Sequence, residues 1–164
     1  MSTEVAHKRW WQIFEVVFGI PTLAAIFLQW AAPVSLPGGD LALAFSAAGI
    51  VLIIAGVALV VLARREFAQY HQPTDPGRPT SKMITSGVFS VSRNPLYLGG
   101  VLILAGIGLA FNLPWVLALL LPAIFACYFV LIAPEEKYLS AKFKDEYINY
   151  SASVYRWLGR TGRP

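Results

Sequence analysis

Charge is scarce in this chain of 164 residues, since 13% of the residues are charged and 57% are apolar. A soluble domain of this length would leave large apolar patches exposed to water. The one cysteine, Cys127, lies within an apolar run, which excludes a disulfide framework and a cysteine metal cluster. The two histidines, His7 and His71, cannot build a zinc site by themselves, so no metal is expected. The low share of charged residues and the high share of apolar residues predict an integral membrane protein.

Four apolar stretches predict an all-α fold with about four transmembrane helices. They cover residues 11–32, 41–63, 96–111 and 113–132, and Glu15 is the one charged residue within them. A helix that crosses the hydrocarbon core needs about 20 residues, which the first two stretches satisfy. Asn112 and Pro114 interrupt an otherwise continuous apolar run, so we expect a helical hairpin there. The pattern leaves open whether these two short helices are tilted, buried or re-entrant.

The basic residues predict the orientation of a single membrane domain over residues 1–164. All of them lie before the first stretch, between the second and third, or after the fourth. The positive-inside rule therefore places both termini, the loop 64–95 and the tail 134–164 in the cytoplasm. A nucleic-acid surface is disfavoured because the charges flank apolar stretches and do not line one face, whereas contact with anionic lipids is expected.

The two polar segments differ in pattern. The sequence "HQPTDPGRPT" predicts turns and extended backbone, and the apolar residues between 83 and 91 are expected to lie against the bundle. The tail is expected to begin a new helix at Pro134, with Glu135 and Glu136 in its first turn. Aromatic residues then recur near helical spacing, which predicts a helix packed on the membrane surface or over the cytoplasmic end of the bundle.

Two polar groups of residues are expected to meet at that end. Arg93, Asn94 and Tyr97 begin the third apolar stretch, and Glu135 and Glu136 follow the fourth. Because the third and fourth helices form a hairpin, these ends must be neighbours. Charge at a membrane edge is costly, so this group favours a site for a small charged ligand.

Each of these residues also has a purely structural interpretation. Arg93 can mark the inner boundary and pair with Glu135, and Tyr97 can belong to an interfacial aromatic belt. Gly99 and Gly100 can allow a ligand to approach the backbone, or can serve close helix packing.

The residues "SRNPLYLGG", an apolar hairpin and then "PEEKYLSAKFKDEYINYSASVYRWL" resemble the isoprenylcysteine carboxyl methyltransferase family and its relatives among the phospholipid methyltransferases. The pattern shared by the family reads Arg-His/Asn-Pro-x-Tyr-x-Gly, a hairpin, and Glu-Glu-x-x-Leu-x-x-x-Phe-Gly-x-x-Tyr-x-x-Tyr. The resemblance extends over residues 80–158, and the preceding half of the chain matches only as apolar stretches.

The resemblance implies an S-adenosylmethionine-dependent membrane methyltransferase whose cofactor binds at the cytoplasmic ends of the hairpin. The glutamates would face the sulfonium and ammonium groups, an arginine would face the carboxylate, and Tyr97 would stack on the adenine or face the sulfonium. Arg93 and Glu135 are expected to act in catalysis. The residues expected to bind the cofactor are Arg93, Asn94, Pro95, Tyr97, Gly99, Glu135 and Glu136.

Three positions depart from the pattern of the family. Asn94 replaces a frequent histidine and cannot serve as a base, Lys144 replaces a glycine, and Ser90 lies where relatives often have arginine. His71 and one of the glutamates are the candidate bases if the acceptor must lose a proton.

A methyl acceptor that reaches a membrane-edge site from the bilayer is expected to be lipid-like. Carboxyl methylation of a prenylated thioether acid is favoured over N-methylation of an aminophospholipid, which stays open as the alternative. A third possibility, from another class, is a membrane module that binds lipid or assists assembly without catalysis. The Asn94-Pro95 variant and the short chain favour a bacterial inner membrane.

Overall fold

The computed structural model describes residues 13–71 and 81–161, and these residues form helices and no named strand. The all-α prediction is confirmed. Residues 11 and 12 of the first expected stretch, His7 and the prolines between residues 72 and 80 lie outside the described residues. The elements are α1 (Phe14–Ala31), α2 (Asp40–Gln69), the 3-10 helix η1 (Gly87–Ser90), α3 (Pro95–Ala110), α4 (Pro114–Cys127), the π-helical turn η2 (Tyr128–Ile132), α5 (Ala133–Phe143) and α6 (Asp145–Ser153).

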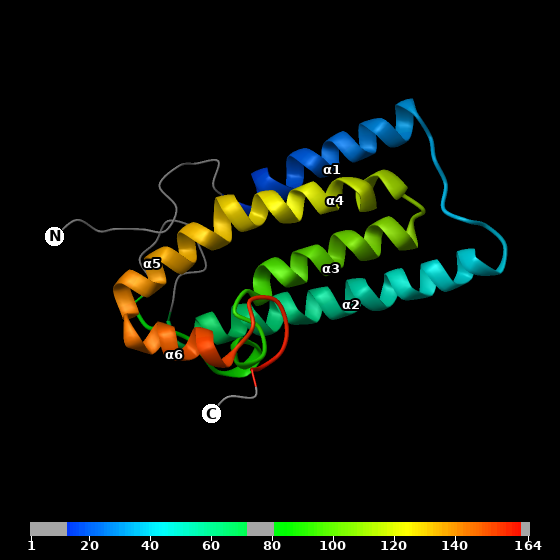
Figure 1. Cartoon of the computed structure of the whole chain (residues 1–164). Helices are drawn as coiled ribbons and strands as arrows, with labels where there is room; N and C mark the ends of the chain where they lie inside the picture. Colours follow the sequence, from blue (N-terminus) through cyan, green and yellow to red (C-terminus); the bar gives the residue numbers. More distant parts are fainter. Residues whose placement is uncertain (1–12, 72–80, 162–164) are drawn as a thin grey trace.

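The bundle consists of α1, α4, α3 and α2, which lie beside one another in that order (Figure 1). The expected hairpin is present, since α3 and α4 are joined by a short turn. By length and composition, α1, α2 and the continuous helix Pro114–Phe143 can each cross a membrane, while α3 is a shorter apolar helix. The structure therefore supports membrane integration, with α3 and α4 in the middle of the bundle.

At one end of the bundle, two hydrogen bonds join the segment that follows α1 to the hairpin turn and to the start of α4. The backbone N–H of Leu36 donates to Oδ1 of Asn112 at 2.6 Å, and the indole N–H of Trp115 donates to the carbonyl oxygen of Ala32 at 2.8 Å. The opposite end, which we call the polar end, contains η1, the start of α3, α5 and α6 (Figure 1). The described Lys and Arg residues lie in the last turns of α2, in the segments next to η1 and α3, or in α5 and the residues that follow it, all toward the polar end. Arg64 and Arg65 lie in the last turns of α2, because this helix continues past residue 63.

Glycines allow α2 and α3 to pack with their backbones in contact. A Cβ atom on Gly56 would lie 2.6 Å from the carbonyl oxygen of Gly99, and one on Gly49 would lie 2.5 Å from the backbone nitrogen of Ala110. A Cβ on Gly106 would in turn meet the carbonyl oxygen of Gly49 at 2.6 Å. Small residues on facing helices are the usual means of close approach inside a membrane. Gly99 therefore faces α2.

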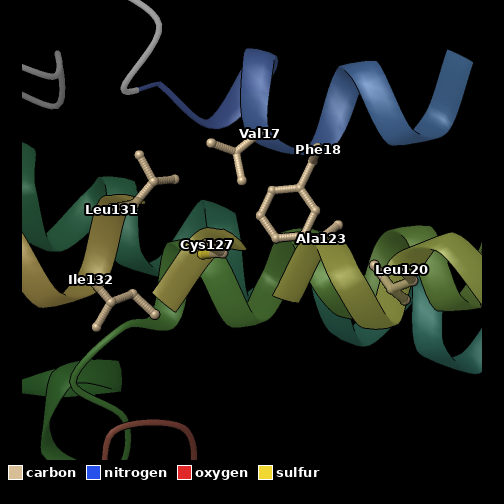
Figure 2. Close-up of a cluster of buried hydrophobic side chains, with 7 residues drawn as sticks. All are labelled: Val17, Phe18, Leu120, Ala123, Cys127, Leu131 and Ile132. Atoms are coloured by element: carbon tan, nitrogen blue, oxygen red, sulfur yellow. The ribbon is translucent and has the colours of Figure 1, made fainter. Parts of the chain in front are cut away.

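Larger side chains fill the contact between α1 and α4. Phe18 of α1 is 2% exposed and packs against a surface of α4 that contains Ala123 and Cys127 (Figure 2). The small side chains on α4 leave room for the aromatic ring, as close packing of an apolar core requires. Val17, Leu120, Leu131 and Ile132 complete this cluster. It fixes the start of α1 next to the helix that carries the two glutamates.

The helix expected to start at Pro134 is instead the continuation of α4. Proline lacks an N–H group, and its ring would clash with the carbonyl of the residue four positions earlier. In the widened turn η2 just before it, the N–H of Ala133 bonds the carbonyl of Tyr128, five residues back. The wider turn lets the helix pass the proline without ending. Glu135 and Glu136 thus lie on one continuous helix with α4.

The tail contains two helices separated at Lys144. Lys144 has φ 45° and ψ −119°, a backbone conformation that favours glycine. This is the position at which the family pattern has glycine. The chain turns here, and α6 lies beneath α5 at the polar end (Figure 1).

Candidate functional site

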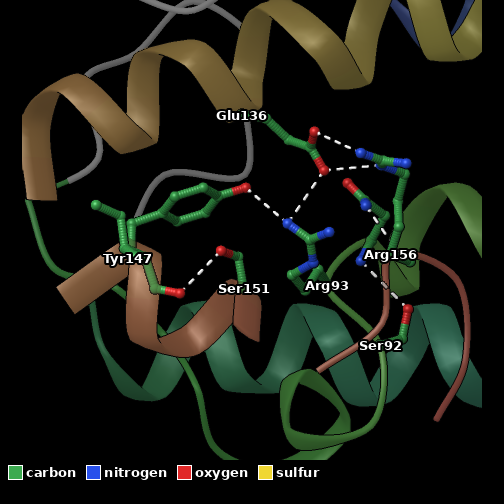
Figure 3. A network of polar contacts seen from close by, with 8 residues as sticks. Ser92, Arg93, Glu136, Tyr147, Ser151 and Arg156 are labelled. Carbon is green, nitrogen blue, oxygen red and sulfur yellow. Dashed lines mark hydrogen bonds and ion pairs between the residues drawn. The ribbon is translucent and has the colours of Figure 1, made fainter. Parts of the chain in front are cut away.

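Glu136 lies between two arginines from different parts of the chain. Oε1 of Glu136 is 3.2 Å from Nη1 of Arg93, which directly precedes the start of α3. Arg156 donates from Nε to Oε1 at 2.8 Å and from Nη2 to Oε2 at 2.9 Å (Figure 3). The side chains of Arg93 and Glu136 are 13% and 20% exposed, so this ion pair is largely removed from water. A bidentate arginine pair fixes the plane of the carboxylate as well as its position.

Glu135 is held by a residue of α3. The hydroxyl of Tyr97 donates to Oε2 of Glu135 at 3.2 Å. Together with the Arg93–Glu136 ion pair, this bond joins both glutamates to the first turn of α3 and the residues before it. The hairpin therefore brings the two expected groups of residues together.

Asn94 and Pro95 set the start of α3. Pro95 occupies the first turn, where its missing N–H has no helical partner to lose. Asn94 is 8% exposed, and its side-chain amide donates to the carbonyl oxygen of Arg156 at 3.1 Å. Its backbone N–H is bonded to Oγ of Ser92 at 3.2 Å. Asn94 thus connects the start of α3 to the C-terminal part of the chain.

The segment 154–161, which we call the tail loop, follows α6 and returns to the residues before α3. The N–H of Arg93 donates to the carbonyl oxygen of Tyr155 at 3.1 Å, and the N–H of Gly159 donates to that of Val91 at 2.7 Å. An isolated antiparallel bridge between Val154 and Arg160 closes the loop on itself. These backbone bonds place the side chain of Arg156 beside Glu136.

Two tyrosines complete the cluster around the arginines. Nη1 of Arg93 donates to the hydroxyl of Tyr147 at 3.1 Å (Figure 3), and the guanidinium carbon of Arg156 lies 4.9 Å from the centre of the Tyr128 ring. Burial, followed by the charge of Glu136, raises the pKa of Tyr147 above its ordinary value, so this hydroxyl is neutral near pH 7. Hydrogen bonding to Glu136 raises the pKa of Arg156 against the opposing effect of burial.

One donor in the cluster is unused. Nε of Arg93 is buried and has no hydrogen-bond partner among residues 13–71 and 81–161. A buried N–H of a charged group is costly to leave without an acceptor. The donor set therefore fits a ligand that brings its own anionic or carbonyl oxygen to Arg93.

Two other expected residues lie apart from this cluster. Gly99 faces α2, where a Cβ atom would meet the side chain of Val60 at 2.6 Å. His71 is exposed just beyond the end of α2, and none of the contacts described above involves it.

Sequence reasoning did not assign Tyr128, Tyr147 or Arg156 to the site. Tyr128 lies in an apolar run, and Tyr147 is one of several aromatic residues at helical spacing. The sequence around Arg156 contains no motif that marks it. Its contact with Glu136 depends on how the tail loop folds back toward the residues before α3.

The chain is similar to a known protein family over the segment that contains the hairpin. The phospholipid methyltransferase model matches residues 44–146, more than half of the chain. The chain belongs to the phospholipid methyltransferase family. This family is related to the isoprenylcysteine carboxyl methyltransferases, so the resemblance seen in the motifs is confirmed. No curated protein and no solved structure matches the chain.

Family membership and the apolar helices together describe a membrane methyltransferase for a lipid-like substrate. The matched segment includes Arg93, Tyr97, Glu135 and Glu136, and it ends just before Tyr147. The contacts made by Tyr147 and Arg156 are therefore features of this chain beyond the matched segment.

Proposed function

We propose that this protein transfers a methyl group from S-adenosylmethionine to a lipid acceptor, with isoprenylcysteine carboxyl O-methylation as the closest parallel. The observation that carries the proposal is the cluster of Arg93, Tyr97, Glu135 and Glu136 where the hairpin ends at the polar end. This cluster combines two carboxylates, an arginine with an unused donor and an aromatic ring at the edge of the apolar bundle.

The chemistry of these donors suits S-adenosylmethionine. The cofactor supplies a methyl group activated on a sulfonium, and it also carries an ammonium and a carboxylate. Glu135 and Glu136 would attract the positive groups, and the free Nε of Arg93 would receive the carboxylate. Tyr97 would offer an aromatic face to the sulfonium or the adenine. Asn94 and Pro95 would act by fixing the start of α3, and Gly99 by holding α3 against α2.

Arg93 and Glu135 are the proposed catalytic residues. Methyl transfer is an in-line displacement, so the main tasks of the protein are to align the two reactants and to exclude water. Both side chains are fixed by contacts between two elements, which suits an aligning role.

A carboxylate acceptor agrees best with the described cluster. A carboxylate needs no proton removal before it attacks, whereas an ammonium must first lose a proton. Asn94 stands where a histidine base is frequent in relatives, and its amide is engaged with Arg156. His71 makes none of the contacts of the cluster.

N-methylation of an aminophospholipid is the second candidate. The family to which the chain belongs is named for the methylation of phospholipids, which favours this candidate. Glu135 would then attract the ammonium headgroup and accept its proton, a role for which its hydrogen bond from Tyr97 provides a fixed position.

The orientation is part of the proposal. The described basic residues lie toward the polar end, in the last turns of α2, beside η1 and α3, or in and after α5, which supports a cytoplasmic location for that end and both termini. A bacterial inner membrane would present the site to a cofactor dissolved in the cytoplasm.

The test is a methyl-transfer assay with the purified protein in bilayer discs. Methyl-labelled S-adenosylmethionine is supplied with farnesylated cysteine or with phosphatidylethanolamine, and label in the extracted lipid is measured. We expect the label to appear in the farnesylated cysteine as a methyl ester, from which alkali releases it as labelled methanol. Alkali-stable label in phosphatidylethanolamine would establish the second candidate instead.

Two variants control this assay. Glu135→Gln should abolish the transfer, and Arg64→Gln, at an exposed position near the end of α2, should retain it. A folded protein that binds S-adenosylhomocysteine but labels neither lipid would contradict both acceptors. A folded protein that also fails to bind S-adenosylhomocysteine would favour the non-catalytic module.

A further inference from the structure

The first residue of α1 occupies a space that α3 leaves open next to the site. The ring of Phe14 lies against Gly100, and a Cβ atom on Gly100 would lie 2.3 Å from Cζ of that ring. Any larger residue at position 100 would therefore displace the ring or the helix. Gly100 is buried, and it is close in sequence to Tyr97. Because Gly100 has no side chain, α1 can approach the start of α3 closely.

Phe14 also touches the tyrosine that holds Glu135. The rings of Phe14 and Tyr97 are stacked, with centroids 6.5 Å apart and an interplanar angle of 16°. Phe14 also stacks on Phe18, with centroids 4.5 Å apart and an interplanar angle of 27°. Phe18 is itself fixed in the buried cluster between α1 and α4 (Figure 2). Phe14 therefore connects a rigid part of the core to Tyr97.

This arrangement forms a chain of contacts that ends at a proposed catalytic residue. Phe18 fixes Phe14, Phe14 limits the positions open to the Tyr97 ring, and the Tyr97 hydroxyl bonds Glu135. Side chains around a site must be held by packing if the groups they support are to keep a productive geometry. Phe14 lies in neither motif and outside the matched segment.

We infer that Phe14 is a positioning residue of the site, which acts through the Tyr97 ring to set the place of the Glu135 carboxylate. The inference rests on the proposed function and adds α1 to the elements that build the site. It predicts that loss of the Phe14 ring lowers kcat while KM for the lipid acceptor stays nearly constant. A small misplacement near a reacting centre can cost about 100-fold in rate, so a loss of roughly tenfold is expected.

The test compares Phe14→Leu with Phe27→Leu, both in bilayer discs. Leucine keeps most of the apolar volume, so the fold is retained while the ring contact is lost. Phe27 lies on the same helix and is 60% exposed, which makes it a matched control. We expect the kcat loss in Phe14→Leu alone. Equal losses in both variants, or a rise in KM with unchanged kcat, would overturn the inference.

A second pair of variants tests the space at Gly100. Gly100→Ala should displace the Phe14 ring and lower kcat in the same way as Phe14→Leu. Gly19→Ala is the matched control, because a Cβ atom at Gly19 meets nothing within 4 Å. The combined Gly100→Ala/Phe14→Leu variant should lose little more than either change alone, since both act on one contact. Additive losses would count against the inference.

A measurement without cofactor separates this inference from the proposed function. 3-Fluorotyrosine is placed at position 97, and its fluorine resonance is recorded in ligand-free protein. We expect Phe14→Leu to shift or broaden the resonance and Phe27→Leu to leave it unchanged. An unchanged resonance in Phe14→Leu would overturn the inference whatever the activity. If Phe14→Leu changes the resonance while the wild-type protein transfers no methyl group to either lipid, the contact is established and the proposed function is contradicted.

Discussion

The carboxylate of Glu136 and the guanidinium of Arg93 form a largely buried ion pair of 3.2 Å that connects the continuous helix from Pro114 to Phe143 with the start of α3. Arg156 binds the same carboxylate with two hydrogen bonds from the tail loop. One acidic side chain thus joins three segments that are distant in sequence. The polar end depends on this residue for its geometry.

Glu136→Gln should weaken the polar end and its ligand binding together. Both arginines lose a charged partner, and removing one partner from a buried hydrogen bond costs about 1–3 kcal/mol. We expect a lower thermal unfolding temperature in detergent and at least tenfold weaker binding of S-adenosylhomocysteine. Glu146→Gln, at an exposed position in the first turn of α6, is the control and should leave binding unchanged.

Lys144→Gly should stabilise the protein. Lys144 has φ 45° and ψ −119°, and a non-glycine residue in such a conformation costs about 1–3 kcal/mol. Part of the gain is offset, because glycine makes the unfolded chain more flexible. We expect a higher midpoint of thermal unfolding with cofactor binding retained. A lower midpoint of thermal unfolding would show that the lysine side chain stabilises the protein by more than its backbone strain destabilises it.

Gly56→Ala should disrupt the contact between α2 and α3. The new Cβ atom would lie 2.6 Å from the carbonyl oxygen of Gly99, and backbone cannot yield as a flexible side chain can. Overpacking of this kind costs about 1–3 kcal/mol. Gly38→Ala, where a Cβ atom meets nothing within 4 Å, is the control. Equal unfolding temperatures for the two variants would contradict the described packing.

Tyr150→Phe should change how stability depends on pH. The hydroxyl of Tyr150 donates to the carbonyl oxygen of Phe89 at 2.7 Å, and burial raises the pKa of Tyr150 above its ordinary value of 10.0. The neutral phenol is therefore favoured in the folded protein. Its contribution is complete below about pH 10 and is lost as the pH rises toward the higher folded-state pKa.

The variant should thus be less stable than wild type near pH 8, by about 1 kcal/mol for the lost hydrogen bond. Between about pH 10 and 11.5 its unfolding temperature should fall less steeply than that of wild type. Parallel curves over this range would show that Tyr150 does not titrate with unfolding.

The sequence was sufficient to predict the four apolar helices, the hairpin and the meeting of Arg93 and Tyr97 with the two glutamates, but not the division of the tail into α5 and α6. These predictions rest on apolar length and on the rule that the two ends of a hairpin are neighbours. The position of Arg156 was not predictable, because it depends on backbone hydrogen bonds from Tyr155 and Gly159 to residues before α3.

The continuation of α4 past Pro134 and the orientation of Gly99 were not predictable from the sequence either. A proline after an apolar run normally indicates a helix boundary, but the π-helical turn before Pro134 lets the helix continue. A glycine in a motif can serve a ligand or a neighbouring helix, and only the packed structure places Gly99 against α2.

The proposed function depends on the binding of S-adenosylmethionine to the residues joined at the polar end. The most direct test is calorimetric titration of S-adenosylhomocysteine into the purified protein in bilayer discs, with Glu135→Ala and the control Arg64→Gln alongside. We expect micromolar binding to wild type and to Arg64→Gln, and loss of binding in a folded Glu135→Ala. Binding that survives in Glu135→Ala, or no binding to folded wild-type protein, would contradict the proposed binding of S-adenosylmethionine at these residues.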